Sequence, residues 1–415
     1  MVFNYIWIAF FLIGFLIALI RLALGDYAVM PDMLTALFDM AKTSFDIVLG
    51  LVGIMTLWMG LMKIGEQAGV IAYMSRIVSP FMRRLFPEIP KDHPALGQIL
   101  MNFSANVLGL DNAATPLGLK AMKSLQELNP EKDRASNSMI MFLVLNASSL
   151  TLFPISVLMY RAQEGAANPT DVFVPIIIAT FFSSLTGLLL CTIRQRINLL
   201  DPVLLFGLLG LSGFIAFMIW HFGSLSKEDL EIQSKLVSSI FILAVIILFI
   251  AAGAYKKLNV FNSFVEGAKD GFQFTVGLLP YVLGMLISIV VFRTSGAMDY
   301  VLQGIEWGYV SVAGLFMENP RTDFIPGLPV GLMKPLSGGG ARGLMLEAMK
   351  TYGADSIPGR LGCIIQGSTE TTFYVVTLYF GSVGITKTRY TLGYGLLADL
   401  AGIIAAVIMT YLFFG

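Results

Sequence analysis

The sequence contains little charge for its length. Only 13% of the 415 residues are Asp, Glu, Lys or Arg, whereas 56% are hydrophobic. A soluble domain normally carries about 25% charged residues, so a soluble protein of this length is excluded. The low charge and the long apolar runs predict an integral membrane protein, most of whose surface contacts the lipid bilayer.

Other residue types that carry chemistry are also scarce. The two cysteines, Cys191 and Cys363, lie in apolar runs, which excludes a disulfide framework. The two histidines, His93 and His221, lie far apart, so we expect no zinc site or other metal site. The 27 basic and 27 acidic residues balance, which gives no sign of a nucleic-acid partner. No Ser/His/Asp, Cys/His or paired-carboxylate arrangement stands in a supporting context, so we expect neither an enzyme nor a cofactor.

Long apolar runs predict an all-α membrane fold with about nine transmembrane helices, because about 20 apolar residues cross the hydrocarbon core. The first run lacks the basic start and small-residue cleavage site of a signal peptide, so we expect an uncleaved helix. Three runs contain an acidic residue, Asp46, Glu370 or Asp399, and we expect Asp46 and Asp399 to be structural. The expected spans are 3–22, 43–62, 138–160, 172–193, 202–221, 236–255, 271–292, 361–382 and 391–413.

Two longer stretches, 63–137 and 293–360, do not fit this pattern. Each mixes charged residues with short apolar pieces and many Gly, Pro and Asn residues. Their apolar pieces, Ala95–Leu110 and Phe324–Leu336, are too short to span the bilayer, and segments of that length are often re-entrant. We therefore expect one re-entrant hairpin in each stretch, covered by protein or by a water-filled cavity.

The chain repeats itself in order. Ala41–Phe45 recurs as Ala268–Phe272, and Ala121–Ser124 recurs as Ala348–Thr351. Further along, the polar run that begins at Asn146 aligns with the run that begins at Gln366. Several matches in the same order predict two structural repeats.

Each predicted repeat consists of a span, a re-entrant stretch and two more spans. The repeats cover about 36–193 and 263–415, and the spans 202–221 and 236–255 link them. The three spans of the first repeat and the two linking spans make five membrane crossings from the start of one repeat to the start of the next. An odd number of crossings reverses the direction of the chain, so we expect the second repeat to be inverted relative to the first. Secondary transporters built from inverted repeats bind their substrate near the bilayer midplane, between the repeats.

The distribution of basic residues predicts the orientation in the membrane. If the N-terminus lies inside the cell, the cytoplasmic loops contain more Lys and Arg than the external loops. Cytoplasmic loops of membrane proteins normally carry this excess. These loops include Arg83, Arg84, Arg194 and Arg196. We expect a cytoplasmic N-terminus and a C-terminus on the other side.

The tips of the two predicted hairpins are rich in polar and small residues. A glycine run before a helix can present N–H groups to an anion, and an arginine can bind a carboxylate or phosphate with two hydrogen bonds. The glycines are equally compatible with a tight turn that merely allows close packing. The candidate residues are Asn106, Asp111, Asn112 and Thr115 in the first tip, and Lys334, Ser337, Gly338, Gly339, Gly340 and Arg342 in the second.

Two polar runs interrupt predicted spans beside the hairpins. In membrane helices such residues can simply hydrogen-bond one helix to another. Because both repeats place them next to a re-entrant stretch, we favour a substrate site that lines a cavity. The candidates are Asn146, Ser148 and Ser149 in the first repeat, and Gln366, Ser368, Thr369, Glu370 and Thr371 in the second.

Glu370 is the strongest single candidate among these residues. It could form a structural ion pair with Arg342 or Lys334, or it could bind a cation or carry a proton. We favour the functional role. If transport is coupled to Na⁺ or H⁺, Glu370 or Asp111 is the expected ion site.

These motifs resemble a known family. Leu108–Pro116 is similar to spore maturation protein A, whereas Lys334–Gly343 and Gln366–Tyr374 resemble spore maturation protein B. The chain resembles a fusion of an A-like half (about 1–195) and a B-like half (about 200–415). Each half resembles the nucleoside recognition or Gate domain, which also occurs in concentrative nucleoside transporters and ferrous iron transporters. The resemblance implies a transport-like protein of the bacterial inner membrane and names no substrate.

Two hypotheses of function follow. In the first, the protein transports a small polar or anionic metabolite, or a lipid-linked cell-envelope precursor, through a midplane site between the repeats. In the second, it is a membrane scaffold that regulates envelope or peptidoglycan machinery without transport. A wet cavity at Glu370 and Arg342 would favour transport, and a dry interface would favour the scaffold. Transporter-like folds of this kind often form homo-oligomers, dimers or trimers, and the sequence selects neither.

Overall fold

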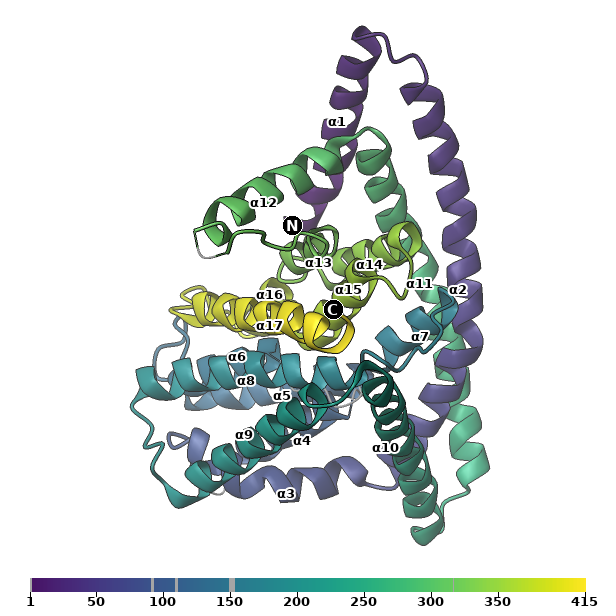
Figure 1. Cartoon of the computed structure of the whole chain (residues 1–415). Helices are drawn as coiled ribbons and strands as arrows, with labels where there is room; N and C mark the ends of the chain where they lie inside the picture. Colours follow the sequence, from purple (N-terminus) through teal and green to yellow (C-terminus); the bar gives the residue numbers. More distant parts are fainter. Residues whose placement is uncertain (1, 91–92, 109–110, 149–153, 316) are drawn as a thin grey trace.

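The structure is a computed structural model that describes residues 2–90, 93–108, 111–148, 154–315 and 317–415 (Figure 1). Helices form the regular structure of these residues, which contain no strand, as the sequence predicts. Seven helices in the described part are long and apolar enough to cross a membrane. They are α1 (Val2–Ala23), α2 (Val29–Gln67), α8 (Phe173–Gln195), α9 (Pro202–Gly223), α10 (Lys227–Tyr255), α11 (Val260–Thr294) and α17 (Thr391–Phe414). The all-α integral membrane fold is thus confirmed.

The two remaining predicted spans are broken. In place of a helix over 138–160, the chain forms α6 (Asn137–Ser148) and α7 (Ile155–Gln163). In place of a helix over 361–382, it forms α15 (Ile357–Ser368) and α16 (Thr372–Gly381). The prediction of continuous helices at these two places was wrong.

Local backbone chemistry explains the breaks. Pro154 precedes α7 with non-helical backbone angles, φ −77° and ψ 50°, and it lacks an N–H group to donate. Thr369 follows α15 with extended backbone angles, φ −143° and ψ 165°. A helix that ends inside a protein leaves backbone groups without intrahelical partners, so each break supplies free N–H and C=O groups at depth.

Two hairpins of short helices occupy the stretches that the sequence marks as re-entrant. The first pairs α4 (Pro94–Val107) with α5 (Asp111–Leu128). The second pairs α13 (Leu328–Met333), which follows the 3₁₀ turn η1 (Ile325–Gly327), with α14 (Gly338–Tyr352). The 14-residue α4 is about 21 Å long, less than the roughly 30 Å of the hydrocarbon core. These lengths suit hairpins that enter a bilayer and return.

The same order of helices occurs twice along the chain. In the first copy α2 is followed by α3 (Val70–Leu85), the α4–α5 hairpin, the broken pair α6/α7 and α8. In the second copy α11 is followed by α12 (Ala297–Ala313), the α13–α14 hairpin, the broken pair α15/α16 and α17. Helix α1 precedes the first copy, and α9 and α10 connect the two. The division into halves near residues 195–200 stays a prediction.

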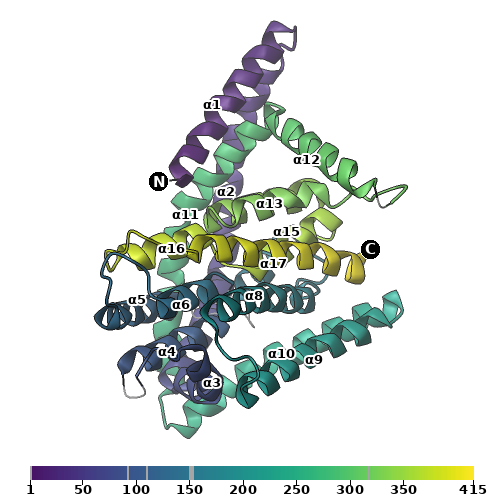
Figure 2. The ribbon, with the colours of Figure 1, turned by 90° about the vertical axis from the view of Figure 1, so that its left-hand side faces the viewer.

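Equivalent helices of the two copies run antiparallel. Helices α2 and α11 lie side by side, along the right-hand edge of the molecule in Figure 1 and behind the other helices in Figure 2. A Cβ on Gly60 would lie 2.6 Å from the Phe264 ring, and one on Gly271 would lie 2.9 Å from the Met55 carbonyl oxygen. Small residues let membrane helices approach this closely. The antiparallel contact is the one that an inverted repeat requires.

Helices α8 and α17 form the corresponding pair in the centre of the molecule. They cross the α2–α11 pair at a steep angle, stacked with α6 and α16 (Figure 2). At one end the Gln195 amide donates to the Tyr390 hydroxyl (3.2 Å), and further along Gly402 packs against Ser183. This pair places the two broken helices next to each other.

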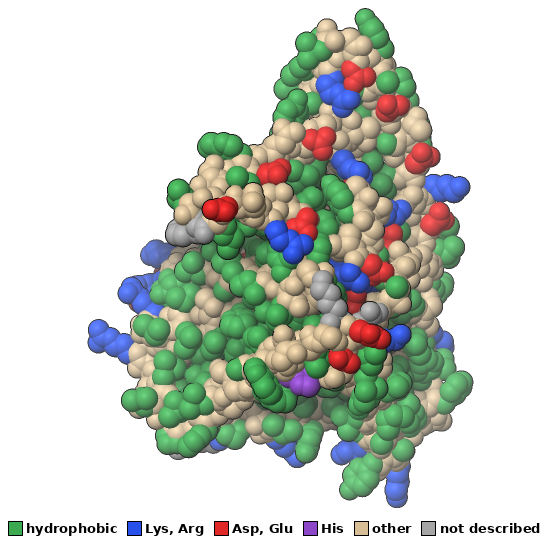
Figure 3. Space-filling view, in the orientation of Figure 1, with side chains coloured by type: hydrophobic (Ala, Val, Ile, Leu, Met, Phe, Trp, Pro, Cys, Tyr) green, Lys and Arg blue, Asp and Glu red, His purple; other side chains and the backbone are tan. Residues whose placement is uncertain are grey.

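Much of the outer surface is apolar, as a bilayer requires. Figure 3 shows hydrophobic side chains spread over most of the visible face. Helices α1, α9 and α10 carry many of them, including Leu12, Phe206 and Leu243, each more than half exposed. The 39-residue α2 is about 58 Å long, so it must tilt in the bilayer or extend beyond it.

Candidate functional site

The two breaks meet each other. The backbone N–H of Glu370, in the second break, donates to the carbonyl oxygen of Ala147 at the end of α6 (2.8 Å). The Ser184 hydroxyl of α8 donates to the carbonyl oxygen of Ser148 (3.1 Å). The polar runs that the sequence aligned with each other therefore form one region, in which free backbone groups of both repeats are used.

The second hairpin closes on the second break. The Lys334 ammonium donates to the carbonyl oxygen of Gln366 (2.9 Å), and the N–H of Phe373 donates to the carbonyl oxygen of Pro335 (2.9 Å). Gly338 lies so close to Thr371 that a Cβ would stand 2.7 Å from the threonine hydroxyl. The hairpin tip therefore lies directly against the extended segment between α15 and α16.

The glycine run combines packing with helix capping. The Ser337 hydroxyl accepts a hydrogen bond from the N–H of Gly340 (3.0 Å), which caps α14. Gly340 is buried, and a Cβ there would lie 2.8 Å from Met333, so close packing explains this glycine. Gly339 is exposed at the tip.

The first hairpin closes on the first break in the same way. The Asn106 amide donates to the Asn146 side-chain oxygen (2.9 Å), and the Asn146 amide donates to the carbonyl oxygen of Phe142 (2.9 Å). The Asn102 amide donates to the carbonyl oxygen of Ala114 across the hairpin (2.7 Å). These bonds fix the predicted residues Asn106 and Asn146 beside each other.

Each hairpin also contacts the broken helix of the other repeat. Tyr379 of α16 lies against the first hairpin, where a Cβ on Gly118 of α5 would stand 2.5 Å from its hydroxyl. In return, the Arg342 guanidinium of α14 lies over the ring of Tyr160 in α7, 5.7 Å from its centre. Hairpins and broken helices of both repeats thus interlock reciprocally. Sequence reasoning missed Tyr160 and Tyr379, because aromatic residues in apolar runs look like ordinary packing.

Two charged side chains of this region lack ionic partners within the described part of the chain. Arg342 is half-buried, and its Nε atom is buried without a hydrogen-bond partner. Glu370 is also half-buried and forms no ion pair with Arg342 among the described residues. The Lys334 ammonium donates to the Gln366 backbone. The structural alternative for Glu370, an ion pair with Arg342, is thus absent from the described structure, which leaves both charges available to a ligand.

Further polar atoms of the breaks are buried and unsatisfied. The Gln366 Oε1 and Thr369 Oγ1 atoms have no partner among the described residues. Buried polar atoms normally bind protein or ordered water, so groups of this kind mark places where a ligand or water completes the site. The hydroxyls of Ser148 and Ser368, in contrast, donate to carbonyl oxygens within their own helices.

Three predicted residues cannot be placed in full. Ser149 lies outside the described residues. Asp111 and Asn112 begin α5, and their side chains lie outside the described structure.

A cluster of buried charges ties the repeats together at one end of this region. The Arg161 guanidinium, fully buried at the end of α7, lies 2.8 Å from Asp171 and 2.9 Å from Asp355. Arg360 of α15 also binds Asp171, at 2.9 Å. Burial raises the pKa of Asp171, although the guanidiniums of Arg161 and Arg360 oppose this shift. Each acid of the cluster is paired with an arginine across the repeats, so we assign the cluster a structural role.

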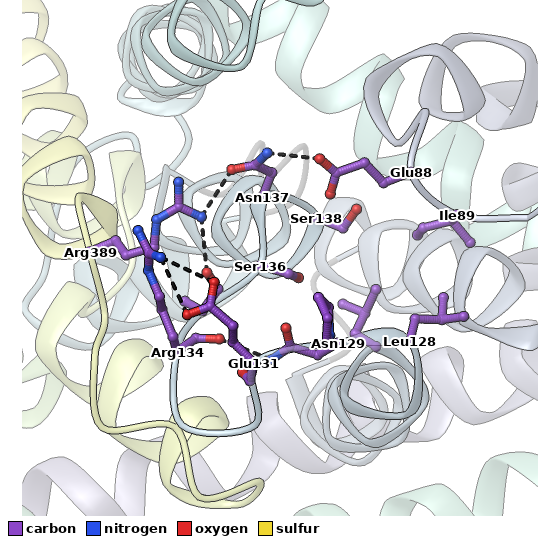
Figure 4. A pocket seen from close by; sticks show the side chains of 13 residues that line it. Glu88, Ile89, Leu128, Asn129, Glu131, Arg134, Ser136, Asn137, Ser138 and Arg389 are labelled. Carbon is purple, nitrogen blue, oxygen red and sulfur yellow. Dashed lines mark hydrogen bonds and ion pairs between the residues drawn. The ribbon is translucent and has the colours of Figure 1, made fainter.

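A pocket of about 440 Å³ lies at the opposite end of α6, where the α5–α6 and α16–α17 loops meet (Figure 4). Arg389 donates to Asn137 (3.0 Å), which donates to Glu88 (2.7 Å), and Arg134 pairs with Glu131 (3.1 Å). The charged groups of the pocket thus already have partners, and the bond from Arg389 to Asn137 links the two repeats. None of the predicted site residues lines it, so we assign it a structural role.

Comparison with known proteins agrees with this architecture. The sequence profile of the Gate family, described as nucleoside recognition, matches residues 48–163, from the middle of α2 to the end of α7. Spore maturation protein A of Bacillus subtilis (strain 168) is 42% identical over 187 residues, which cover 45% of this chain and 92% of that protein. Spore maturation protein B of the same organism is 42% identical over 163 residues, which cover 39% of this chain and 86% of that protein. No solved structure matches the chain. The chain therefore belongs to the spore maturation protein A/B family of Gate-domain membrane proteins.

Proposed function

We propose that this membrane protein transports a small anionic or polar metabolite, and that it is not an enzyme. The observation that carries the proposal is the meeting of two broken helices, one from each repeat, beside a guanidinium that has no ionic partner in the described part of the chain. Discontinuous helices near the midplane are the usual substrate-binding elements of secondary transporters, because their ends can present polar groups to a ligand. A scaffold gains nothing from leaving the Gln366 Oε1 and Thr369 Oγ1 atoms unsatisfied at depth, where each costs free energy.

The charges of the site favour an anionic substrate. Arg342 presents donors in the fork geometry that binds carboxylate and phosphate groups. It follows the glycine-rich start of α14, whose first N–H groups carry partial positive charge. A carboxylate or phosphate of a small metabolite, or of a lipid-linked envelope precursor, would suit these donors.

Basic residues support a cytoplasmic assignment for one end of the molecule. Arg194 ends α8, Arg389 precedes α17, and Arg134 lies in the adjoining α5–α6 loop. An excess of Lys and Arg marks the cytoplasmic side of an inner-membrane protein. We therefore place this end in the cytoplasm, in keeping with a cytoplasmic N-terminus.

A ligand screen on detergent-purified protein tests the proposal. The melting temperature would be measured with nucleosides, dicarboxylates, amino acids and polyprenyl phosphates, for the wild type, Arg342→Gln and Glu370→Gln. Arg321→Gln serves as the matched control, because Arg321 is exposed and already paired with Asp323. A ligand that binds only the folded state stabilises it by about 2.7 kcal/mol at a hundredfold excess over its dissociation constant.

We expect one compound class to raise the melting temperature of the wild type and the Arg321→Gln control but not of Arg342→Gln. A shift that Arg342→Gln and Glu370→Gln both retain would place the ligand elsewhere. No shift across the panel, with intact folded protein, would favour a scaffold that regulates envelope machinery.

A further inference from the structure

Asp399 is a buried carboxylate that the interlocking of the repeats leaves incompletely satisfied. It lies on α17 and is 1% exposed. One carboxylate oxygen accepts a hydrogen bond from the Thr372 hydroxyl (2.6 Å), at the start of α16. The other oxygen is buried and has no partner among the described residues. A carboxylate at this depth normally pairs with a cation or with further donors.

Two more residues with buried, unpartnered oxygens pack against the same stretch of α17. They are Thr369, in the break after α15, and Ser183 of α8, which are 4% and 0% exposed. Gly402, one turn after Asp399, brings both side chains against α17, because a Cβ there would lie 2.8 Å from the Thr369 methyl carbon and 3.5 Å from the Ser183 hydroxyl oxygen. Gly395, one turn before Asp399, packs against the Thr372 methyl carbon in the same way. Side chains with unsatisfied oxygens thus come together from three elements.

These oxygens do not satisfy one another. None of the three has a hydrogen-bond partner in the described structure, although both hydroxyls could donate to a carboxylate. Oxygen ligands lie about 2.3–2.6 Å from a hard cation such as Ca²⁺, so two ligands on opposite sides of an ion are roughly 5 Å apart and do not hydrogen-bond to each other. Neighbouring buried oxygens that leave one another unsatisfied therefore suit an ion between them.

The ligand charges favour a monovalent cation. Asp399 is the one acidic side chain of the three, and Thr369 and Ser183 are neutral hydroxyls. A monovalent cation neutralises a single carboxylate, whereas a divalent ion would leave an excess positive charge at depth.

We propose that Asp399, Thr369 and Ser183 bind Na⁺, between α8, α17 and the break that follows α15. Backbone carbonyls of unwound helices and acidic side chains are the ligands that such ions take in transporters. Since Thr369 and Glu370 are neighbours in the break, Na⁺ fixes the segment that also carries the anion site. This coupling rests on the proposed function, whereas Na⁺ binding itself does not.

The test is the melting temperature of the whole purified protein in NaCl, KCl and choline chloride at equal ionic strength, without any organic ligand. The variants are Thr369→Val, which keeps the shape of the side chain, Ser183→Ala and Asp399→Asn. Thr410→Val is the matched control, because this buried α17 hydroxyl already donates to the Ala406 carbonyl oxygen (2.7 Å).

We expect Na⁺ to raise the melting temperature of the wild type and of Thr410→Val saturably, by about 2 °C at tenfold excess over the dissociation constant. Thr369→Val and Ser183→Ala should need at least tenfold more Na⁺, and Asp399→Asn should not respond. If Asp399→Asn does not fold, the Na⁺ responses of Thr369→Val and Ser183→Ala still test the proposed site.

The proposal is overturned if K⁺ stabilises as well as Na⁺, if the wild type responds to pH but not to Na⁺, or if Thr369→Val and Ser183→Ala keep the wild-type response. None of these outcomes tests the anion site. The response of Arg342→Gln in the ligand screen tests that site separately.

Discussion

The backbone N–H of Glu370 donates a 2.8 Å hydrogen bond to the carbonyl oxygen of Ala147, so the break in one repeat closes on the break in the other. Both partners are backbone groups. Substitutions of the neighbouring side chains therefore keep this contact, and the chemistry of the region can be changed without separating the repeats.

Arg342→Gln is expected to abolish the response to an anionic ligand while the fold stays stable. The guanidinium has no ionic partner in the described structure, and its Nε atom is buried without a hydrogen bond, so its removal breaks no ion pair and loses the contact with the Tyr160 ring. We expect a melting temperature close to that of the wild type. A large fall, measured in detergent without ligand, would instead show that Arg342 is a structural residue.

Arg161→Gln is expected to have the opposite effect on stability. Removal of this buried guanidinium leaves Asp171 and Asp355 without their main partner, a loss of about 3–5 kcal/mol for buried pairs. In Arg134→Gln, the control, an exposed pair with Glu131 is lost, which costs at most about 1 kcal/mol. Urea unfolding of the two variants would measure the difference, and equal stabilities would contradict the structural role of the cluster.

Substitutions of glycine in α2 and α11 should distinguish the effect of helix packing on stability from the effect of helix propensity. In Gly267→Val the new side chain would meet the Met59 carbonyl oxygen, since a Cβ would lie 2.4 Å from it. We expect a loss of at least about 1–3 kcal/mol. Gly53→Ala, with open space around it, should stabilise α2 by up to about 1 kcal/mol. Thermal unfolding in detergent checks both, and a neutral Gly267→Val would refute the close α2–α11 contact.

The stability contributed by the ion pair between Asp133 and Lys387 should depend on pH. A hydrogen bond from the Lys387 ammonium holds the pKa of Asp133 below its ordinary value of 3.8. The charged form is favoured in the folded state, so the pair contributes stability above that value and loses it as the pH falls through the lowered pKa. Melting curves of the wild type and Asp133→Asn should differ slightly at pH 6 and converge below pH 3.8. A gap that widens on acidification would contradict this assignment.

The sequence predicted the helical membrane fold and the positions of the seven long apolar helices, because both follow from composition and apolar run length. It also predicted that the runs beginning at Asn146 and Gln366 belong together, and the structure brings them into contact through Glu370 and Ala147. What it predicted wrongly was the continuity of two helices. Hydropathy averages over some 20 residues, and a break of a few residues such as Thr369–Thr371 leaves that average high.

Contacts between the repeats were beyond sequence reasoning. Nothing in the spacing of Arg342 and Tyr160 shows that they meet, because the contact depends on how a hairpin of one repeat crosses a helix of the other. Asp399 was visible as an acid in an apolar run, but its unsatisfied oxygen becomes evident only when α8, α16 and α17 are packed together.

The central claim is that the region between the two breaks admits water and solutes, and cysteine accessibility tests it most directly. In a background without Cys191 and Cys363, Gln366→Cys would be treated with a membrane-impermeant thiol reagent from each side of a proteoliposome. Ser382→Cys, in an exposed position, is the reactive control, and Ser288→Cys, which is 0% exposed, is the unreactive one. We predict that Gln366→Cys reacts from at least one side, and more slowly when ligand is bound. If it stays as unreactive as Ser288→Cys from both sides while Ser382→Cys reacts, the interface is dry and the protein is not a transporter of this design.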